Sequence, residues 1–250
     1  LFRVSINFVE EVDRALLQKA LQRTIKRIPQ FGYRLRPGLF WFYLEDQDIM
    51  PQVEDDARNP MLPFNLAGST RFMFRLRCHK KRVAMEVFHV LTDGYGATTF
   101  LLTLSAEYLY LKTGKRIPAE GMILDTREAP RREERVDSFP RVARELTQSR
   151  GEQSAWQLKG TPIEAGFLRV VTGIMPTEKL LFLAREKKTT VNTLLAAIIM
   201  QALMIQKEGT KRQKRRPVKL SLPVSLRKYY GSATLRNFSF YVNVPVQTGH

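Results

Sequence analysis

The chain opens with apolar and polar side chains in alternation and then changes to a helical spacing. Phe2, Val4, Ile6 and Phe8 alternate with polar residues, which predicts a half-buried strand over residues 2–8. After Asp13 the apolar stripe comprises Leu16, Leu17, Ala20, Leu21, Thr24, Ile25 and Ile28. Its spacing predicts a helix that ends before Pro29 and packs one face on a sheet.

The same patterns continue to residue 111. An aromatic strand is predicted over residues 40–44 after a Pro37-Gly38 turn, and an irregular crossing over 51–63. Alternating residues over 72–79 and 82–89 predict a β-hairpin. A turn then leads into a helix whose apolar stripe comprises Phe100, Leu101, Leu104, Tyr108 and Leu111.

The second half partly repeats this order after a break. Residues 115–150 carry three prolines and many charges, which predicts a linker or surface excursion. We expect a strand over 166–174, helices over 177–187 and 191–207, and strands over 218–224 and 238–246. The sequence therefore predicts an α/β protein with a mixed sheet and flanking helices, divided into a first lobe over 1–150 and a second over 151–250.

Composition favours a globular protein of one large or two modest domains. The 250 residues are 44% hydrophobic, enough for a sizeable core. The apolar run from Leu194 to Ile205 is too short to span a bilayer, so we expect a buried core helix there. The single cysteine, Cys78, excludes an intramolecular disulfide and favours the cytoplasm. Because Leu1 stands first, without a leader, we expect a fragment or a processed form.

A net charge of +17 indicates anionic partners. The densest cluster is Lys211, Arg212, Lys214, Arg215 and Arg216. It resembles a nucleic-acid or nuclear-targeting patch, although a solvated, mobile surface loop is the simpler interpretation. A binding protein for nucleic acid or another polyanion is thus an alternative function, weakened by the lack of an aromatic stacking motif or a known nucleic-acid module.

One segment combines titratable groups, a glycine and a strand-to-helix turn, and it runs from His89 to Gly94. Imidazole groups with ordinary values of pKa near 6.5 can accept a proton at neutral pH and return it to a leaving group. His89 is therefore a candidate general base, with a buried structural histidine as the alternative. Four residues of extended chain span roughly 13 Å, so Asp93 reaches the His89 ring only if the loop curls sharply. The three histidines lack metal-ligand spacing, and we expect neither a metal nor a bound cofactor.

These residues resemble the signature of the chloramphenicol-acetyltransferase-like, condensation-domain superfamily, of the alcohol-acetyltransferase type. His89, Asp93 and Gly94 match its second histidine, aspartate and glycine, and Phe88 stands where the first histidine usually is. Three further stretches fit the same family, namely Arg27-Ile28-Pro29, Pro223-Val224-Ser225-Leu226-Arg227 and Asn243-Val244-Pro245. The resemblance implies two lobes with a tunnel between them, and a second lobe that is incomplete here.

The resemblance also implies an activity and roles for individual residues. His89 would deprotonate a hydroxyl or amine acceptor that attacks a thioester of coenzyme A or of an acidic carrier protein. Asp93 would pair with Arg227 and support the site, and Gly94 would allow a backbone geometry or a close approach that a Cβ would obstruct. The expected substrate-binding residues are Tyr95, Ser225 and Asn243. A catalytically silent scaffold of the same fold is a further alternative.

Overall fold

The computed structural model describes residues 1–64, 72–142, 151–164, 166–209 and 216–247, and contacts between Cα atoms divide the chain into two compact units. The first unit contains Leu1–Ala143 and Ser225–Ser239, and the second contains Arg144–Val224 and Phe240–His250. The predicted division at residue 150 remains a prediction. The contacts do, however, join Ser225–Ser239 to the first unit, whereas the sequence pattern places this segment in the second lobe.

A four-stranded sheet forms the base of the first unit. Its strands are β1 (Phe2–Asn7), β4 (Val53–Asp55), β5 (Phe74–His79) and β6 (Arg82–Val87). Their order is β1-β6-β5-β4, with β4 parallel to β5 and the other pairs antiparallel, so the sheet is mixed as predicted. The short strand β4 lies in the segment 51–63 that was expected to be irregular.

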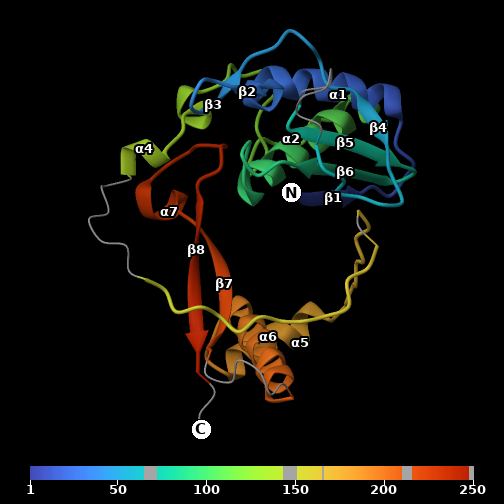
Figure 1. Cartoon of the computed structure of the whole chain (residues 1–250). Coiled ribbons are helices and arrows are strands. Elements are labelled where there is room, and N and C mark those ends of the chain that lie inside the picture. The colour runs from blue at the N-terminus through green and yellow to red at the C-terminus, as the bar shows by residue number, and fades with distance from the viewer. Residues whose placement is uncertain (65–71, 143–150, 165, 210–215, 248–250) are drawn as a thin grey trace. The chain divides into compact units, whose positions relative to one another are not determined.

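Two helices pack on one face of this sheet and on each other (Figure 1). Helix α1 (Arg14–Arg27) begins at Asp13, whose carboxylate accepts a hydrogen bond from the Leu16 amide at 3.0 Å. Helix α2 (Gly94–Thr113) follows the turn after β6 and ends at Gly114, which has the positive φ typical of a helix end. The fully buried side chains between helices and sheet include Leu17, Leu21, Phe31, Leu76, Met85, Phe100 and Leu104. The helical stripes predicted from the sequence are thus the ones that form the core.

A second sheet, of two strands, follows α1 in the chain and is connected to it by the short 3-10 helix η1 (Pro29–Gly32). Its strands are β2 (Arg34–Pro37) and β3 (Phe42–Glu45), which pair antiparallel. The aromatic strand expected from residue 40 therefore starts later, because residues 38–41 form the turn.

The segment after α2 is more structured than the predicted linker. It contains the short helices α3 (Arg132–Arg135) and α4 (Phe139–Val142). The carboxylate of Glu134 is buried and accepts two hydrogen bonds from the guanidinium of Arg27, one of them at 2.9 Å. This buried ion pair explains why a charged stretch with few core-sized residues still folds onto the first unit.

The second unit contains helices α5 (Thr177–Glu186) and α6 (Val191–Glu208). Strands β7 (Val218–Ser225) and β8 (Ser239–Val246) pair as a sheet, and the short helix α7 (Arg227–Tyr230) joins their ends that belong to the first unit. Two expectations are wrong here. Residues 166–174 form no strand, and α6 is not a buried helix, because Met200 and Lys207 are its only buried side chains.

The described residues contain neither a single membrane-spanning helix nor a cluster of metal ligands. None of their helices is by itself long and apolar enough to cross a membrane, while α5 and α6, bent by 86° at their junction, pass that test of length and composition only as a pair. No group of three or more His, Cys, Asp or Glu side chains in these segments is placed to hold a metal ion.

Much of the positive charge on the outer face of the first sheet is neutralised locally. Glu86 is fully buried, and its carboxylate lies 2.8 Å from Arg3, 3.6 Å from Arg75 and 3.5 Å from Arg77. Asp56 likewise lies 2.6 Å from Arg3. These arginines are therefore already paired with carboxylates. The basic cluster 211–216 falls outside the described residues except for Arg216, which is exposed.

Candidate active site

The proposed catalytic histidine lies on the turn that joins β6 to α2. Strand β6 ends at Val87, and the amide of Phe88 donates a hydrogen bond to the Met73 carbonyl at 2.8 Å. Phe88 packs partly against the core, whereas His89 and Val90 are exposed. The His89 ring lies against the ring of Phe2, with 4.9 Å between centroids. Among the described residues its imidazole has no hydrogen-bond partner.

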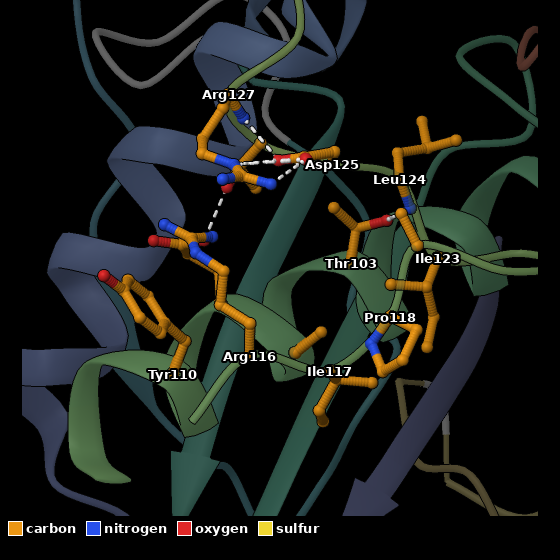
Figure 2. Close-up of a pocket in the computed structure, with 13 residues that line it drawn as sticks. Thr103, Tyr110, Arg116, Ile117, Pro118, Ile123, Leu124, Asp125 and Arg127 are labelled. Carbon is orange, nitrogen blue, oxygen red and sulfur yellow. Dashed lines mark hydrogen bonds and ion pairs between the residues drawn. The ribbon is translucent and has the colours of Figure 1, made fainter. Parts of the chain in front are cut away.

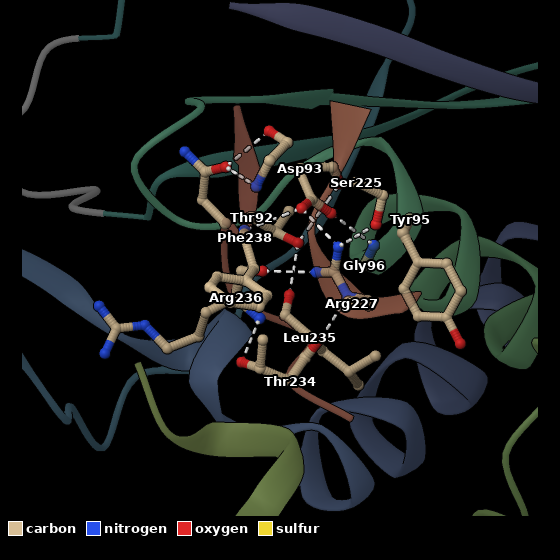
Figure 3. Close-up of polar contacts among 12 residues, drawn as sticks. Thr92, Asp93, Tyr95, Gly96, Ser225, Arg227, Thr234, Leu235, Arg236 and Phe238 are labelled. Atoms are coloured by element: carbon tan, nitrogen blue, oxygen red, sulfur yellow. Dashed lines mark hydrogen bonds and ion pairs between the residues drawn. The ribbon is translucent and has the colours of Figure 1, made fainter. Parts of the chain in front are cut away.

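Asp93 is buried, and its carboxylate is occupied by three donors (Figure 3). One oxygen, Oδ1, accepts from the Gly96 amide at 3.2 Å and thereby caps the N-terminus of α2. The other, Oδ2, accepts from Nη1 of Arg227 at 2.7 Å and from the Phe238 amide at 2.9 Å. The expected pairing of Asp93 with Arg227 is therefore present, and Asp93 makes no contact with His89.

Arg227 organises the loop that runs from Ser225 to Ser239. Its Nε donates to the Thr234 carbonyl and its Nη2 to the Arg236 carbonyl, each at 2.7 Å. The guanidinium also lies 4.7 Å from the centre of the Tyr95 ring. Each of the three nitrogens of this buried side chain therefore has a hydrogen-bond partner. Both members of the ion pair belong to the first unit, so the pair lies within that unit and not across the expected lobe interface.

The glycine that a close approach requires is Gly96 and not Gly94. A Cβ added at Gly96 would lie 2.1 Å from Oγ1 of Thr92 and 2.2 Å from the Leu235 carbonyl oxygen. A Cβ at Gly94 would meet no atom of the described residues within 4 Å, so the expected role of Gly94 remains a prediction. The hydroxyl of Thr92 donates to the same Leu235 carbonyl at 2.5 Å. The loop therefore closes directly onto the first turn of α2.

The three expected substrate-binding residues fall into two groups. Tyr95 is 40% exposed and Ser225 accepts a hydrogen bond from Arg227 at 3.4 Å, so both lie beside the ion pair. Asn243 belongs to the second unit, where its amide donates to Glu152 at 2.9 Å and its oxygen accepts from Ser221 at 2.6 Å. The structure thus brings together Asp93, Arg227, Tyr95 and Ser225, and describes Asn243 only within its own unit.

A separate cavity of about 250 Å³ lies between the second half of α2 and residues 116–127 (Figure 2). The buried carboxylate of Glu107 accepts hydrogen bonds from Arg23 at 2.7 Å and from Thr126 at 2.5 Å. Hydrogen bonds from Arg127 hold the pKa of Asp125 well below its usual range. The charged side chains that line this cavity form ion pairs with one another, Arg116 with Glu107 and Arg127 with Asp125. Its lining includes no residue of the His89 turn.

No protein-family model and no curated protein sequence matches the chain. Solved structures do match it. Polyketide synthase associated protein 5 from Mycobacterium tuberculosis is 15% identical, with a TM-score of 0.61 over 99% of this chain and 64% of that one. The first condensation domain of the CDA synthetase is 16% identical, with a TM-score of 0.55 over 99% of this chain and 63% of that one.

The chain has the chloramphenicol-acetyltransferase-like fold. The predicted fold is therefore confirmed. A third structure with this fold, TRI101 of F. sporotrichioides in complex with coenzyme A and T-2, is 12% identical, with a TM-score of 0.61 over 98% of this chain and 65% of that one. The chain thus spans less than two thirds of the length of each of these three proteins.

The two glycines of the turn provide a matched pair of substitutions. We predict that Gly96→Ala lowers the free energy of unfolding by about 1–3 kcal/mol, since the new methyl group overlaps Thr92 and the Leu235 carbonyl. Gly94→Ala should leave stability nearly unchanged because its Cβ meets open space. Urea denaturation measures both variants. Equal losses would show that the loop does not close onto α2 as described.

A double-mutant cycle measures the energetic coupling between Asp93 and Arg227. We predict that Asp93→Asn and Arg227→Met each cost about 3–5 kcal/mol, because each leaves one buried charge without its partner. The double variant should cost clearly less than the sum. The exposed pair Arg14 and Asp55 serves as the control cycle and should show little coupling. Strictly additive losses at Asp93 and Arg227 would contradict the buried pair.

Proposed function

We propose that the protein transfers an acyl group from a thioester to the hydroxyl or amine of an acceptor, with His89 as the general base. The observation that carries the proposal is the exposed imidazole of His89. It lies on a turn whose other end is held by the buried Asp93–Arg227 pair. The fold supports it, since its solved examples include a condensation domain and a protein that was solved with coenzyme A. Because the chain spans less than two thirds of these proteins, the proposal concerns the whole protein.

In this mechanism His89 accepts the proton of the acceptor O–H or N–H as the acceptor atom attacks the thioester carbonyl carbon. The new bond gives a tetrahedral oxyanion, which collapses by breaking the carbon–sulfur bond. The imidazolium then returns the proton to the departing thiolate sulfur. No covalent acyl-enzyme is needed, and the imidazole ends in the state in which it began.

Asp93 acts in this proposal as a positioning residue and not as the third member of a triad. In a triad the carboxylate accepts a hydrogen bond from the base and orients it. Here both carboxylate oxygens of Asp93 are occupied by Gly96, Arg227 and Phe238. The carboxylate fixes the end of the turn, while contact with Phe2 limits the orientation of the His89 ring.

The oxyanion requires hydrogen-bond donors that face the site. The proposed donors are the backbone N–H of Gly94, at the positive end of the α2 dipole, and the hydroxyl groups of Tyr95 and Ser225. Asn243 is proposed as a further substrate-binding residue from the second unit. The positive net charge of the chain would attract the phosphates of coenzyme A or an acidic carrier protein.

We predict that His89→Ala lowers the rate of acyl transfer by about 10² to 10⁴-fold, because the acceptor then loses its proton without a base. The matched control is His79→Ala, which removes another exposed histidine, at the end of β5. Thiol release from acyl coenzyme A, with alcohol and amine acceptors, measures both. Near wild-type turnover in His89→Ala would exclude His89 as the base.

The same assay separates the alternatives. A wild-type protein that folds but releases no thiol from acyl coenzyme A or acyl carrier protein would favour the silent scaffold. Salt-sensitive binding of mixed oligonucleotides without turnover would favour the polyanion-binding protein.

A further inference from the structure

The β2–β3 hairpin exposes a continuous run of apolar and aromatic side chains at its tip. Residues 39–43, which we name the aromatic tip, are Leu39, Phe40, Trp41, Phe42 and Tyr43, with exposed fractions of 91, 89, 66, 69 and 43%. Single exposed apolar residues are common on protein surfaces, but a contiguous cluster of this size marks an interaction site. The tip has no role in the proposed acyl transfer.

The base of the hairpin holds the aromatic tip in a defined conformation. Leu35 pairs with Leu44 across the hairpin, and both side chains pack against the core of the first unit. Nε of Arg34 donates to the carboxylate of Glu45 at 2.6 Å. The Gly38 amide closes the turn by donating to the Trp41 carbonyl at 2.6 Å, and a Cβ at Gly38 would lie only 2.9 Å from that oxygen. The apolar side chains are therefore displayed by a structured turn.

The distribution of these side chains favours a fluid partner over a protein surface. Phe42 pairs with Pro37 on the face that carries Leu35 and Leu44, and Tyr43 pairs with Arg36 on the opposite face. Apolar groups thus surround the tip on both faces of the hairpin. A flat protein partner would cover one face, whereas a lipid layer that the tip enters covers both.

The residue types and the charge indicate at which depth of a membrane the aromatic tip would lie. Tryptophan and tyrosine are enriched at the boundary between lipid headgroups and hydrocarbon, where their rings are buried and their polar atoms stay hydrated. Residues 37–43 contain no acidic side chain. Arg34 and Arg36 at the base of the hairpin are balanced by Glu45, Asp46 and Asp48, and the chain as a whole carries +17. Anionic lipids attract such a protein, while they would repel an acidic one.

We propose that the aromatic tip inserts into the headgroup region of an anionic lipid bilayer and attaches the first unit to the membrane surface. Insertion at this depth needs no spanning helix. The attachment is independent of the acyl-transfer chemistry, so it can fail while the proposed function holds, and the reverse.

Co-sedimentation with vesicles tests the attachment directly. Wild-type protein should pellet with phosphatidylcholine vesicles that contain phosphatidylglycerol, and weakly with phosphatidylcholine alone. The double variant Phe40→Ser with Trp41→Ser should bind at least about tenfold more weakly, because two large exposed side chains no longer enter the lipid. Phe182→Ser on α5, where the phenylalanine is 70% exposed, is the matched control and should bind like wild type. Loss of binding in the control but not in the tip variant would overturn the proposal.

Tryptophan fluorescence gives a second, local readout. The chain has two tryptophans, of which Trp156 is 8% exposed and Trp41 66% exposed. In a Trp156→Phe variant, the emission of Trp41 should shift to shorter wavelength on addition of the anionic vesicles and be quenched by brominated lipid. Protein that pellets without this shift would overturn insertion of the tip. A change of oligomeric state in the tip variant, with unchanged vesicle binding, would instead assign the tip to contact with a second copy.

Discussion

The buried ion pair between Asp93 and Arg227 is the contact on which the geometry of the candidate site depends. The two residues are 134 positions apart in the chain, and their side chains meet at 2.7 Å. Burying a charge is costly unless it is paired and hydrogen-bonded. Here the carboxylate accepts from two backbone amides as well as from Arg227, and the guanidinium donates to two carbonyls besides Asp93. The pair therefore defines the start of α2 and the course of residues 225–239 together.

In this arrangement, neighbouring residues of the turn have different roles. Asp93 and Thr92 are buried and bound to the later loop, whereas His89 and Val90 face outwards. A base must reach its substrate and still keep a stable position. The turn meets both needs because the residues that anchor it are not the residue that would exchange protons.

Periodicity predicted the elements whose apolar pattern is complete within one stretch of sequence. The alternation over residues 2–8 and the stripe after Asp13 correspond to β1 and α1, because each strand or helix face packs on the core that its pattern implies. Strand β4 was missed because three residues are too few for a period to show. The expectation of a buried helix at α6 was wrong because burial depends on which neighbours cover a face, and the described residues leave Ile198, Ile199 and Ile205 exposed.

Some features of the candidate site could be predicted from neighbouring residues in the sequence, whereas others depend on distant segments. The motif with His89, Asp93 and Gly94 is local in sequence and could be read directly. The need for glycine at Gly96 could not, because it comes from the Leu235 carbonyl of a distant segment. The sequence Gly94-Tyr95-Gly96 indicated that a glycine is needed at this turn. It did not indicate which of the two glycines faces the loop of residues 225–239. Residues 40–44 were likewise predicted to form a strand. Their apolar pattern does not reveal the turn that Gly38 closes, and this turn is what exposes the aromatic tip.

Hydrogen exchange in an Arg227→Met variant tests most directly whether the ion pair holds the turn. Arg227 makes no hydrogen bond to the Gly96 amide, so a purely local effect would stop at residues 226–238. The account predicts that the Gly96 and Ala97 amides at the start of α2 lose protection together with the Phe238 amide, because Asp93 then loses the partner that fixes its carboxylate. Loss of protection confined to residues 226–238, with α2 protected as in the wild type, would contradict it.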